Sequence, residues 1–270
     1  MSVGQWNPRR EALGHPATQT AIEIRPGQVE LSLEGLGTCR VGGEGAVFSA
    51  HDDQAFDALD DTLGLWAYGV WLGLNGVFAF HGSVLERDGV AIALVGGARS
   101  AITVTAFALT RRGWRLVADD VCPLIVDGSA VIAQAALPEI HIDSLVAKHV
   151  PWQVESRRLL TPRSRTAIAV DGAASCELTH LFTLIGTNTR PDARIVTPGL
   201  AEQRSEFMAA SCLGQSLLSA TPGLRSALEA HIDRVLDIHP LQALLTPRTW
   251  TPDAFTPPQL AEWLEEAATS

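Results

Sequence analysis

The stretch from Gly96 to Asp120 reads GGARSAITVTAFALTRRGWRLVADD and gives the clearest indication of the fold class. Its opening glycines follow an apolar, strand-like run. The segment Ala101–Arg112 has the character of a helix, and Gly113 after it is a favourable helix end. The next run is almost wholly apolar and closes on Asp119 and Asp120. Strand, glycine-rich turn, helix, glycine and buried strand is the order of a βαβ unit, whose ligand sites form after the first strand. The stretch therefore predicts an α/β fold.

A hairpin precedes this unit. The runs FHGSVLE (80–86) and VAIALVGG (90–97) are both strand-like, and Arg87–Gly89 between them supplies a tight turn. Upstream of the hairpin, residues 51–74 predict a helix that an aspartate caps at its start and that ends near Asn75. The hairpin thus supplies the strand that leads into the glycine-rich turn.

The rest of the chain completes a larger α/β domain. Residues 21–47 contain short alternating runs bounded by Pro-Gly and Gly-Gly, which predict a small antiparallel meander. We predict a small β-rich region over 1–60, and over 61–270 a core with a mixed or largely parallel sheet and C-terminal helices. Beyond the βαβ unit, the strand-like runs are 167–170 and 181–185, and the helical ones are 202–218, 223–236 and 258–268.

Composition limits the classes of function. The chain has 270 residues, of which 46% are hydrophobic and 19% charged, and its net charge of −10 disfavours a nucleic-acid partner. The densest apolar stretch, Leu63–Phe80, contains several glycines and predicts a buried helix rather than a membrane span. No basic segment followed by an apolar one opens the chain, so we expect a cytoplasmic protein. The one basic cluster either holds an anionic ligand or is a solvated loop, and the loop is the expectation; its residues are Arg157, Arg158, Arg163 and Arg165.

The four cysteines and most of the histidines give no sign of a metal or redox site. No pair of cysteines has the C-x-x-C spacing, so we expect buried thiols. Five histidines are scattered without metal-ligand spacing and are interpreted as structural. The cysteines are Cys39, Cys122, Cys176 and Cys212, and these histidines are His141, His149, His180, His231 and His239.

The stretch from Gly96 to Asp120 resembles the HPr serine kinase/phosphorylase family. That family has the pattern G-x-x-x-x-G-K-S/T, then a helix, then R-G-x-R-L-V-A-D-D, and the match runs without a gap over 25 residues. His81, one strand upstream, stands where the family has a histidine. Residues 137–149 (LPEIHIDSLVAKH) and 240–250 (PLQALLTPRTW) are similar to segments of the shorter HPr-kinase-related proteins. The resemblance covers about residues 60–265, and its specific part is confined to residues 81–122.

This resemblance implies a P-loop core with ATP and Mg²⁺ as cofactors. In such a loop, backbone N–H groups at a helix start surround the phosphates, a lysine reaches the β and γ oxygens, and a hydroxyl binds magnesium. An aspartate can accept the proton of the attacking serine hydroxyl. The resemblance assigns catalysis to His81, Asp119 and Asp120, nucleotide binding to Gly96, Gly97, Arg99, Ser100 and Thr103, and magnesium to Thr103 and Asp119. The split of roles between the two aspartates stays open.

The chain departs from the family inside the loop. Arg99, Ala101 and Ile102 stand where the family has its middle glycine, its last glycine and its lysine, whereas Thr103 keeps the hydroxyl. Loss of a charge aimed at the transferred phosphoryl group costs on the order of 3 to 4 kcal/mol. Ala101 also places a Cβ where the loop needs a positive φ. Weak ATP binding through this loop is therefore expected.

Three functions remain open. The first is a pseudokinase descended from a peptide or protein serine kinase, which binds a peptide or carrier-protein partner, as in peptide natural-product maturation. The second is an active serine phosphotransferase in which Arg99 replaces the lysine. The third is an ATP-independent enzyme that uses His81, Asp119 and Asp120 as acid/base or metal-binding groups. The hexamers of HPr kinases make a homo-oligomer an expectation.

Other residues near the loop have two interpretations. Arg111, Arg112 and Arg115 are alternative replacements for the lysine, but their places match the helix end and strand start of the family, so a structural role is expected. Trp114 either lines a peptide groove or packs in the core, and core packing is the expectation. His81 taken alone fits a core histidine better than a catalytic one, and its position beside the motif makes the two roles equal alternatives.

Overall fold

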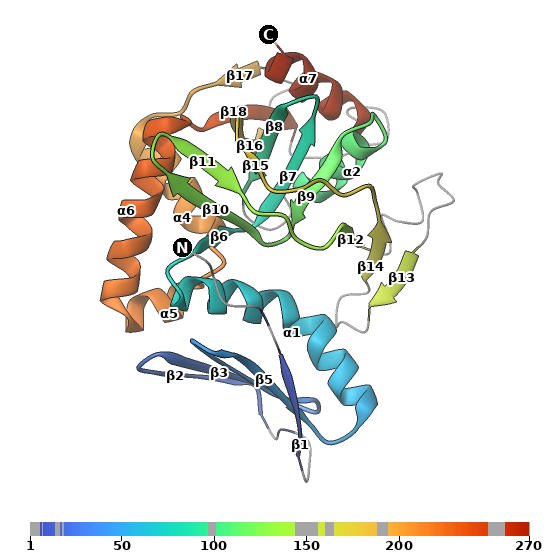
Figure 1. Ribbon diagram of the computed structural model, residues 1–270, viewed down its shortest axis with the longest axis vertical. Helices are drawn as coiled ribbons and strands as arrows, with labels where there is room; N and C mark the ends of the chain where they lie inside the picture. Colours follow the sequence, from blue (N-terminus) through green and yellow to red (C-terminus); the bar gives the residue numbers. More distant parts are fainter. Residues whose placement is uncertain are drawn as a thin grey trace. The chain divides into compact units, whose positions relative to one another are not determined.

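The computed structural model describes residues 6, 8–13, 17, 19–96, 101–143, 156–159, 165–187, 194–247 and 257–269. It divides into two compact units (Figure 1). Unit 1 holds residues 1–79, 142–167 and 212–227, and unit 2 holds residues 80–141, 168–211 and 228–270. Among the described helices, none combines the length and the apolar character that a membrane crossing needs.

Unit 1 begins with a five-stranded sheet of order β1-β5-β4-β3-β2. Strands β2 to β5 form the predicted antiparallel meander, and β1 adds to β5 in parallel. Alternate residues point to one face, where Cys39 and Phe48 are buried. The strands are β1 (Arg9–Ala12), β2 (Ala21–Arg25), β3 (Gln28–Leu33), β4 (Gly37–Gly42) and β5 (Gly45–Ala50).

Helix α1 (Asp53–Leu74) packs on β4 and β5 of this sheet. Its predicted acidic cap is confirmed, because Asp52 accepts a hydrogen bond from the backbone N–H of Ala55 over 2.7 Å. The helix ends where the sequence predicted, and Asn75 closes it with hydrogen bonds to the carbonyls of the last turn. The predicted buried helix is thus confirmed.

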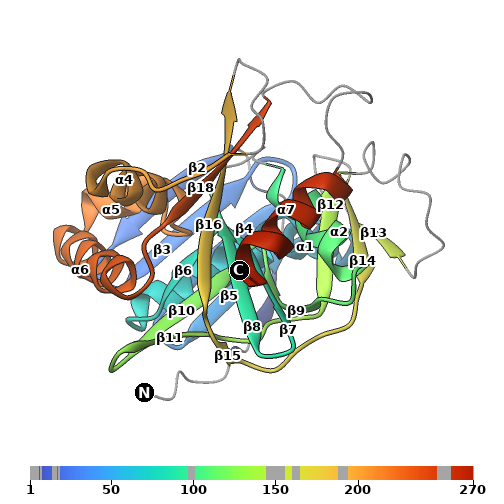
Figure 2. The same cartoon turned by 90° about the horizontal axis from the view of Figure 1, so that it is seen from above.

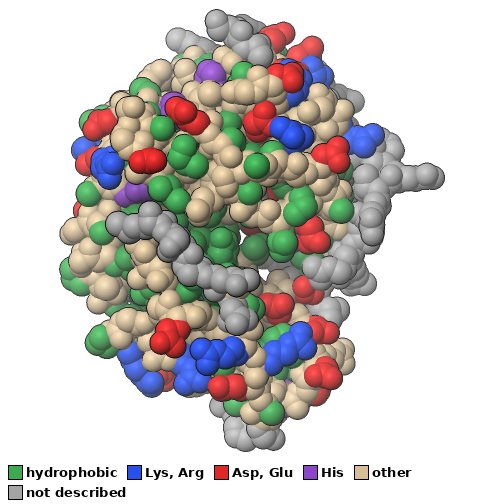
Figure 3. Space-filling view, viewed as in Figure 1, with side chains coloured by type: hydrophobic (Ala, Val, Ile, Leu, Met, Phe, Trp, Pro, Cys, Tyr) green, Lys and Arg blue, Asp and Glu red, His purple; other side chains and the backbone are tan. Residues whose placement is uncertain are grey.

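Charged side chains of unit 1 pair with one another. Arg25 contacts Glu23 over 2.7 Å, and Arg40 contacts Glu11 over 3.5 Å. On the face that Figure 3 presents, acidic and basic side chains are intermingled.

Unit 2 is built on a six-stranded mixed sheet of order β17-β18-β16-β8-β7-β9. Strands β18, β16 and β8 are parallel, whereas β7 is antiparallel to both β8 and β9. Strands β8 and β9 therefore run in the same direction, with β7 between them, as a βαβ crossover requires. The strands are β7 (Gly82–Arg87), β8 (Val90–Val95), β9 (Arg115–Asp119), β16 (His180–Thr187), β17 (Arg194–Val196) and β18 (Gln242–Pro247).

Two helices lie together at one side of this sheet, as Figures 1 and 2 show. Helix α2 (Ile102–Thr110) contacts β7, and α7 (Pro257–Thr269) packs on α2. Both were predicted at these places. The hairpin turn is also confirmed, because Asp88 and Gly89 both have positive φ, the geometry that a two-residue hairpin needs.

The remaining elements complete the fold. Helices α4 (Leu200–Ala210) and α6 (Pro222–Ile238) are linked by Arg204 and Asp233, 2.5 Å apart. Strand β11 pairs with β10 and β15, and a further sheet has the order β12-β14-β13. These strands are β6 (Phe78–Phe80), β10 (Cys122–Asp127), β11 (Ala130–Ala133), β12 (Glu139–Asp143), β13 (Ser156–Leu159), β14 (Arg165–Ala169) and β15 (Cys176–Glu177).

One predicted helix is wrong in its extent. The sequence predicted a single helix over 202–218, but α4 ends at Ala210 and a short helix, α5 (Gln215–Ala220), follows. Ser211 leaves the helix to form a bridge with Phe80, an interaction between distant parts of the chain. The one local sign of the break is Gly214, which precedes α5.

Candidate active site

The candidate site lies where β8 and β9 end and β7 begins. Ser83 of β7 is in register with Asp119 of β9, and Gly82 is in register with Val95 of β8. Both parallel strands thus deliver their carboxyl ends to one edge of the sheet, where α/β ligand sites form. Close approach needs Gly82, because a Cβ there would lie 2.1 Å from the carbonyl oxygen of Leu94.

The two predicted aspartates are held at a sharp break in the chain. Asp119 ends β9, and Asp120 adopts a left-handed φ of 60°, which aspartate tolerates better than most residues. The backbone N–H of Val121 then bonds to the carbonyl of Asp119 over 2.7 Å, and β10 follows. Because of this turn, the two neighbouring carboxylates have different partners.

Asp119 is almost completely buried and accepts two hydrogen bonds. Ser83 Oγ donates to its Oδ1 over 2.5 Å, and the backbone N–H of His141 donates to its Oδ2 over 3.3 Å. Burial raises the pKa of Asp119 most strongly and the charge of Asp120 raises it further, whereas the two hydrogen bonds lower it. The balance raises the pKa of Asp119 to about 7.

Asp120 lies between two histidine rings. His81 Nε2 is 3.6 Å from its Oδ1, and His141 Nδ1 is 3.4 Å from its Oδ2. The other ring nitrogen of His141 lies 3.6 Å from Glu139 Oε2. The site therefore continues from His81 through Asp120 and His141 to the half-buried Glu139.

His81 is fixed from three sides. Its backbone N–H donates to the carbonyl of Ala210 over 2.6 Å, and its carbonyl accepts from the N–H of Gly96 over 3.2 Å. Its Nδ1 lies 3.0 Å from the carbonyl oxygen of Gly96. Because a carbonyl oxygen only accepts, Nδ1 carries the hydrogen in this contact and Nε2 is left to face Asp120. This arrangement suits a proton acceptor or donor.

The start of α2 is the described part of the predicted phosphate loop. Ala101 precedes the helix with φ of 62°, and its own side chain makes no capping hydrogen bond. Ile102 is buried with 2% of its surface exposed, while Thr103 is half-buried. Gly97, Arg99 and Ser100, three of the predicted nucleotide-binding residues, lie outside the described residues.

The structure brings together three predicted residues and adds others. His81, Asp119 and Asp120 meet at one site, joined by Ser83 and by His141, which the sequence had placed among the structural histidines. Ser83 is reached through strand register, and His141 arrives on β12, so no local motif marked them. Within the described ranges, no three His, Cys, Asp or Glu residues are placed to hold a metal ion.

Other predicted residues are placed outside the site. Trp114 is buried with 1% of its surface exposed, which confirms core packing over a peptide groove. Arg115 pairs with Glu86 over 2.5 Å and Arg112 with Glu265 over 2.6 Å, in keeping with structural roles. Cys39 and Cys122 are buried as expected, whereas Cys176 and Cys212 are half-buried. The basic cluster near residue 160 lies mostly outside the described residues.

No protein-family profile matches the chain, and no curated protein matches it significantly. Among solved structures, the fold is similar to the HPr(Ser) kinase/phosphatase from Coxiella burnetii. The two chains are 15% identical, the match covers 71% of this chain and 90% of the other, and the TM-score is 0.36. The likeness is distant and concerns the fold alone, so no role of a residue is inferred from it.

Proposed function

We propose that this chain is a degenerate relative of peptide and protein serine kinases, which binds ATP weakly and recognises a peptide or carrier-protein partner. The observation that carries the proposal is the burial of Ile102 at the first position of α2. In the motif that the sequence resembles, the lysine occupies this position. An apolar side chain packed into the core supplies no charge to a phosphate.

Ala101 supports the same interpretation. It adopts the left-handed φ that a glycine provides without strain, at a cost of about 1 to 2 kcal/mol for a residue with a Cβ. Ala101 therefore has the φ of a glycine position although it carries a Cβ. Loss of the glycine and of the lysine at adjacent positions is expected when nucleotide binding is no longer needed.

A second candidate function rests on the carboxylate–histidine site. His81 Nε2 and His141 Nδ1 lie 3.6 Å and 3.4 Å from the carboxylate oxygens of Asp120. The pKa of Asp119 is raised to about 7, near the value that suits general acid–base catalysis. These groups would serve an ATP-independent enzyme as well as a former kinase. The partner class and self-association follow from the family resemblance alone.

Calorimetric titration of ATP with Mg²⁺ tests the proposal. The parent protein is expected to show no binding in the micromolar range, and Ile102→Lys, alone or with Ala101→Gly, is expected to gain it. A matched control is Val104→Lys, which adds the same charge to a half-buried position of the same helix.

Three outcomes separate the candidates. Micromolar binding by the parent that Arg99→Ala abolishes would overturn the proposal in favour of an active phosphotransferase. Equal gains in Ile102→Lys and Val104→Lys would mean that charge alone, and not the motif position, attracts ATP. No gain in either variant would leave no nucleotide site to restore and would favour ATP-independent chemistry.

A further inference from the structure

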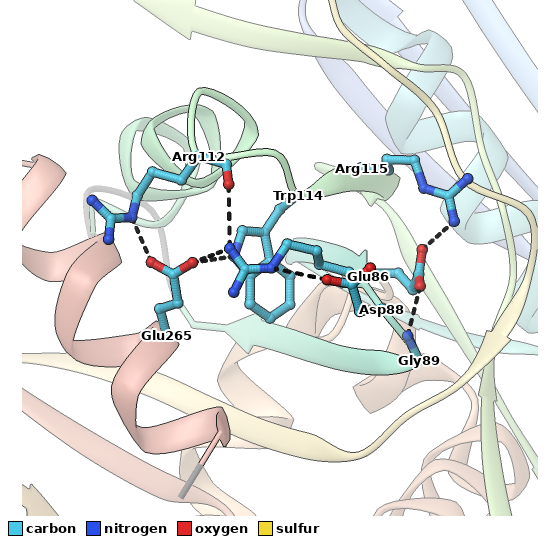
Figure 4. Close-up of polar contacts among 8 residues, drawn as sticks. Glu86, Asp88, Gly89, Arg112, Trp114, Arg115 and Glu265 are labelled. Atoms are coloured by element: carbon cyan, nitrogen blue, oxygen red, sulfur yellow. Dashed lines mark hydrogen bonds and ion pairs between the residues drawn. The ribbon is translucent and has the colours of Figure 1, made fainter.

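A second cluster of charged groups lies in unit 2, at the opposite ends of α2 and β9 from the candidate site. Glu265 of α7 binds donors from three separate places in the chain, as Figure 4 shows. Arg112 donates from Nε to Oε2 over 2.6 Å, and Trp114 donates from Nε1 to Oε1 over 3.3 Å. Arg87, from the end of β7, also donates to Oε1. One carboxylate thus joins β7, the end of α2 and the start of β9.

The donors also contact one another. Arg87 donates to the carbonyl of Arg112 over 3.2 Å, and its guanidinium carbon lies 4.9 Å from the centroid of the Trp114 ring. Only 13% of the Glu265 side chain is exposed. Burial raises the pKa of Glu265, but the hydrogen bonds from Arg112, Arg87 and Trp114 together outweigh burial and lower it. The carboxylate is therefore charged at neutral pH, and both of its oxygens accept hydrogen bonds.

Helix α7 packs on α2 and also contacts β8 of the sheet. Its buried residues recur at helical spacing, and α2 is itself buried along most of its length, from Ile102 to Leu109. An apolar face alone fixes neither the rotation nor the axial position of a packed helix. The directed bonds of Glu265 supply this definition. The buried residues of α7 are Leu260, Ala261, Leu264 and Ala268.

Helix α2 and strand β9 lead directly from this cluster to the candidate site. The nine residues of α2 span about 14 Å and the five residues of β9 about 17 Å. At the ends away from Glu265, Ala101 precedes α2 and Asp119 ends β9. Because a helix and a paired strand are stiff over such lengths, a shift at Arg112 and Trp114 is transmitted to both ends.

We propose that Glu265 is a latch that holds α7 on the corner between α2 and β9. Through this corner it keeps the start of α2, Asp119 at the end of β9 and the adjoining Asp120 in place. Glu265 is a positioning residue and touches none of the site groups. The proposal goes beyond the function given above, since it concerns the geometry of the site whether or not that site binds a nucleotide.

NMR spectroscopy of Glu265→Gln tests the latch without any ligand. Glutamine keeps the shape of the side chain but removes the charge that attracts the three donors. The matched control is Glu262→Gln on the exposed side of the same helix. At a fixed pH, we expect Glu265→Gln to shift the indole N–H signal of Trp114 and the ring signals of His81. The first signal is assigned with Trp114→Phe and the second set with His81→Gln.

Hydrogen exchange gives the second measurement. In Glu265→Gln, the amides of residues 102–110 and 115–119 are expected to exchange at least about tenfold faster, while those of β16 and β18 keep their rates. Glu262→Gln is expected to change neither the spectra nor the exchange.

Two results would overturn the proposal. A Trp114 shift with unmoved His81 signals would confine Glu265 to a local role, and uniformly faster exchange across unit 2 would make it a general stabilising residue. If Glu265→Gln does not fold, Arg112→Gln takes its place, because this variant removes only one half-exposed donor. Its spectra must then show the same signals shifted by less.

Discussion

Ser83 Oγ lies 2.5 Å from Asp119 Oδ1, and both residues are buried between neighbouring strands of the mixed sheet. The hydroxyl can donate to the charged carboxylate and accept from the protonated one. The pKa of Asp119 is raised to about 7, mainly by burial. Folding thus favours the protonated form of this carboxyl group, and stability becomes linked to pH.

The first prediction concerns Asp119→Asn. Between pH 4 and 7, the folded state holds a proton on Asp119 that the unfolded state has lost, so the stability of the wild type falls as pH rises, by at most about 1.4 kcal/mol per pH unit. Asparagine cannot titrate. Urea unfolding at each pH is expected to show the wild type losing stability relative to the variant across this window.

Buried histidines act in the other direction and must be separated. The pKa of His231 is lowered to about 4 by burial, so protonation of the unfolded state lowers stability as pH falls from about 6.5 to 4. This contribution is common to both proteins and cancels in their difference. A difference that stays constant from pH 4 to 8 would show that Asp119 does not titrate in this range.

The second prediction concerns Ser83→Ala, which removes a hydrogen bond to a carboxylate. Such bonds contribute about 1.5 to 3 kcal/mol when the acceptor is charged, so the loss is expected to be larger at pH 8 than at pH 5. The pKa of Asp119 should rise further, because the bond lowers it. NMR of the side-chain carboxyl carbon of Asp119 measures the pKa, and urea unfolding measures the loss of stability.

Ser49→Ala is the control for this prediction, since Ser49 is also buried in a strand, in the sheet of unit 1. Its replacement is expected to change stability by an amount that does not depend on pH. An equal loss for Ser83→Ala at both pH values would mean that the bond does not discriminate between the two forms of Asp119.

The third prediction uses the strained start of α2. Ala101→Gly removes the cost of a Cβ at a φ of 62°, which is about 1 to 2 kcal/mol, and adds about 0.5 to 1 kcal/mol of unfolded-chain entropy. The variant should therefore be as stable as the parent or more stable, by up to about 1.5 kcal/mol. The same substitution at Ala106, buried inside the helix, should destabilise by about 1 kcal/mol or more. Equal losses at both positions would refute the strain.

Sequence reasoning succeeded where the signal is local. The turn at Asp88 and Gly89, the Asp52 cap and the extent of α2 are each set by a few neighbouring residues, and each was predicted. Asp119 and Asp120 were singled out because they follow a buried strand in a motif, and their catalytic role stays a prediction.

Sequence reasoning failed to predict contacts between residues that are distant in the sequence. Glu265 meets Arg87 from 178 residues away, and His141 reaches Asp119 from 22 residues away. Hydrophobic periodicity assigns a residue to a face but carries no information on which charged group will lie opposite. The break after Ala210 has the same cause, since Ser211 pairs with Phe80 instead of continuing the helix.

The fourth prediction concerns Cys39, which lies in the core of unit 1. Burial raises its thiol pKa to about 12, helped by the nearby charges of Asp60 and Glu30. Because only the thiolate reacts, an increase from 9.0 to about 12 lowers the reactive fraction at pH 8 by about a thousandfold. Iodoacetamide should therefore modify Cys39 only when unit 1 opens.

Cysteine labelling also measures whether the two units open together. Cys122 is buried in unit 2, so peptide mass mapping in increasing urea follows each unit through its own thiol. We expect half-buried Cys212 to be modified first. Cys39 should be modified only at urea concentrations that also lower the far-ultraviolet circular dichroism of the protein. Rapid native labelling of Cys39 would contradict its burial, and Cys39→Ser identifies its peptide without ambiguity.

Separate midpoints for Cys39 and Cys122 would show that the units unfold independently, whereas one midpoint would show a single cooperative transition.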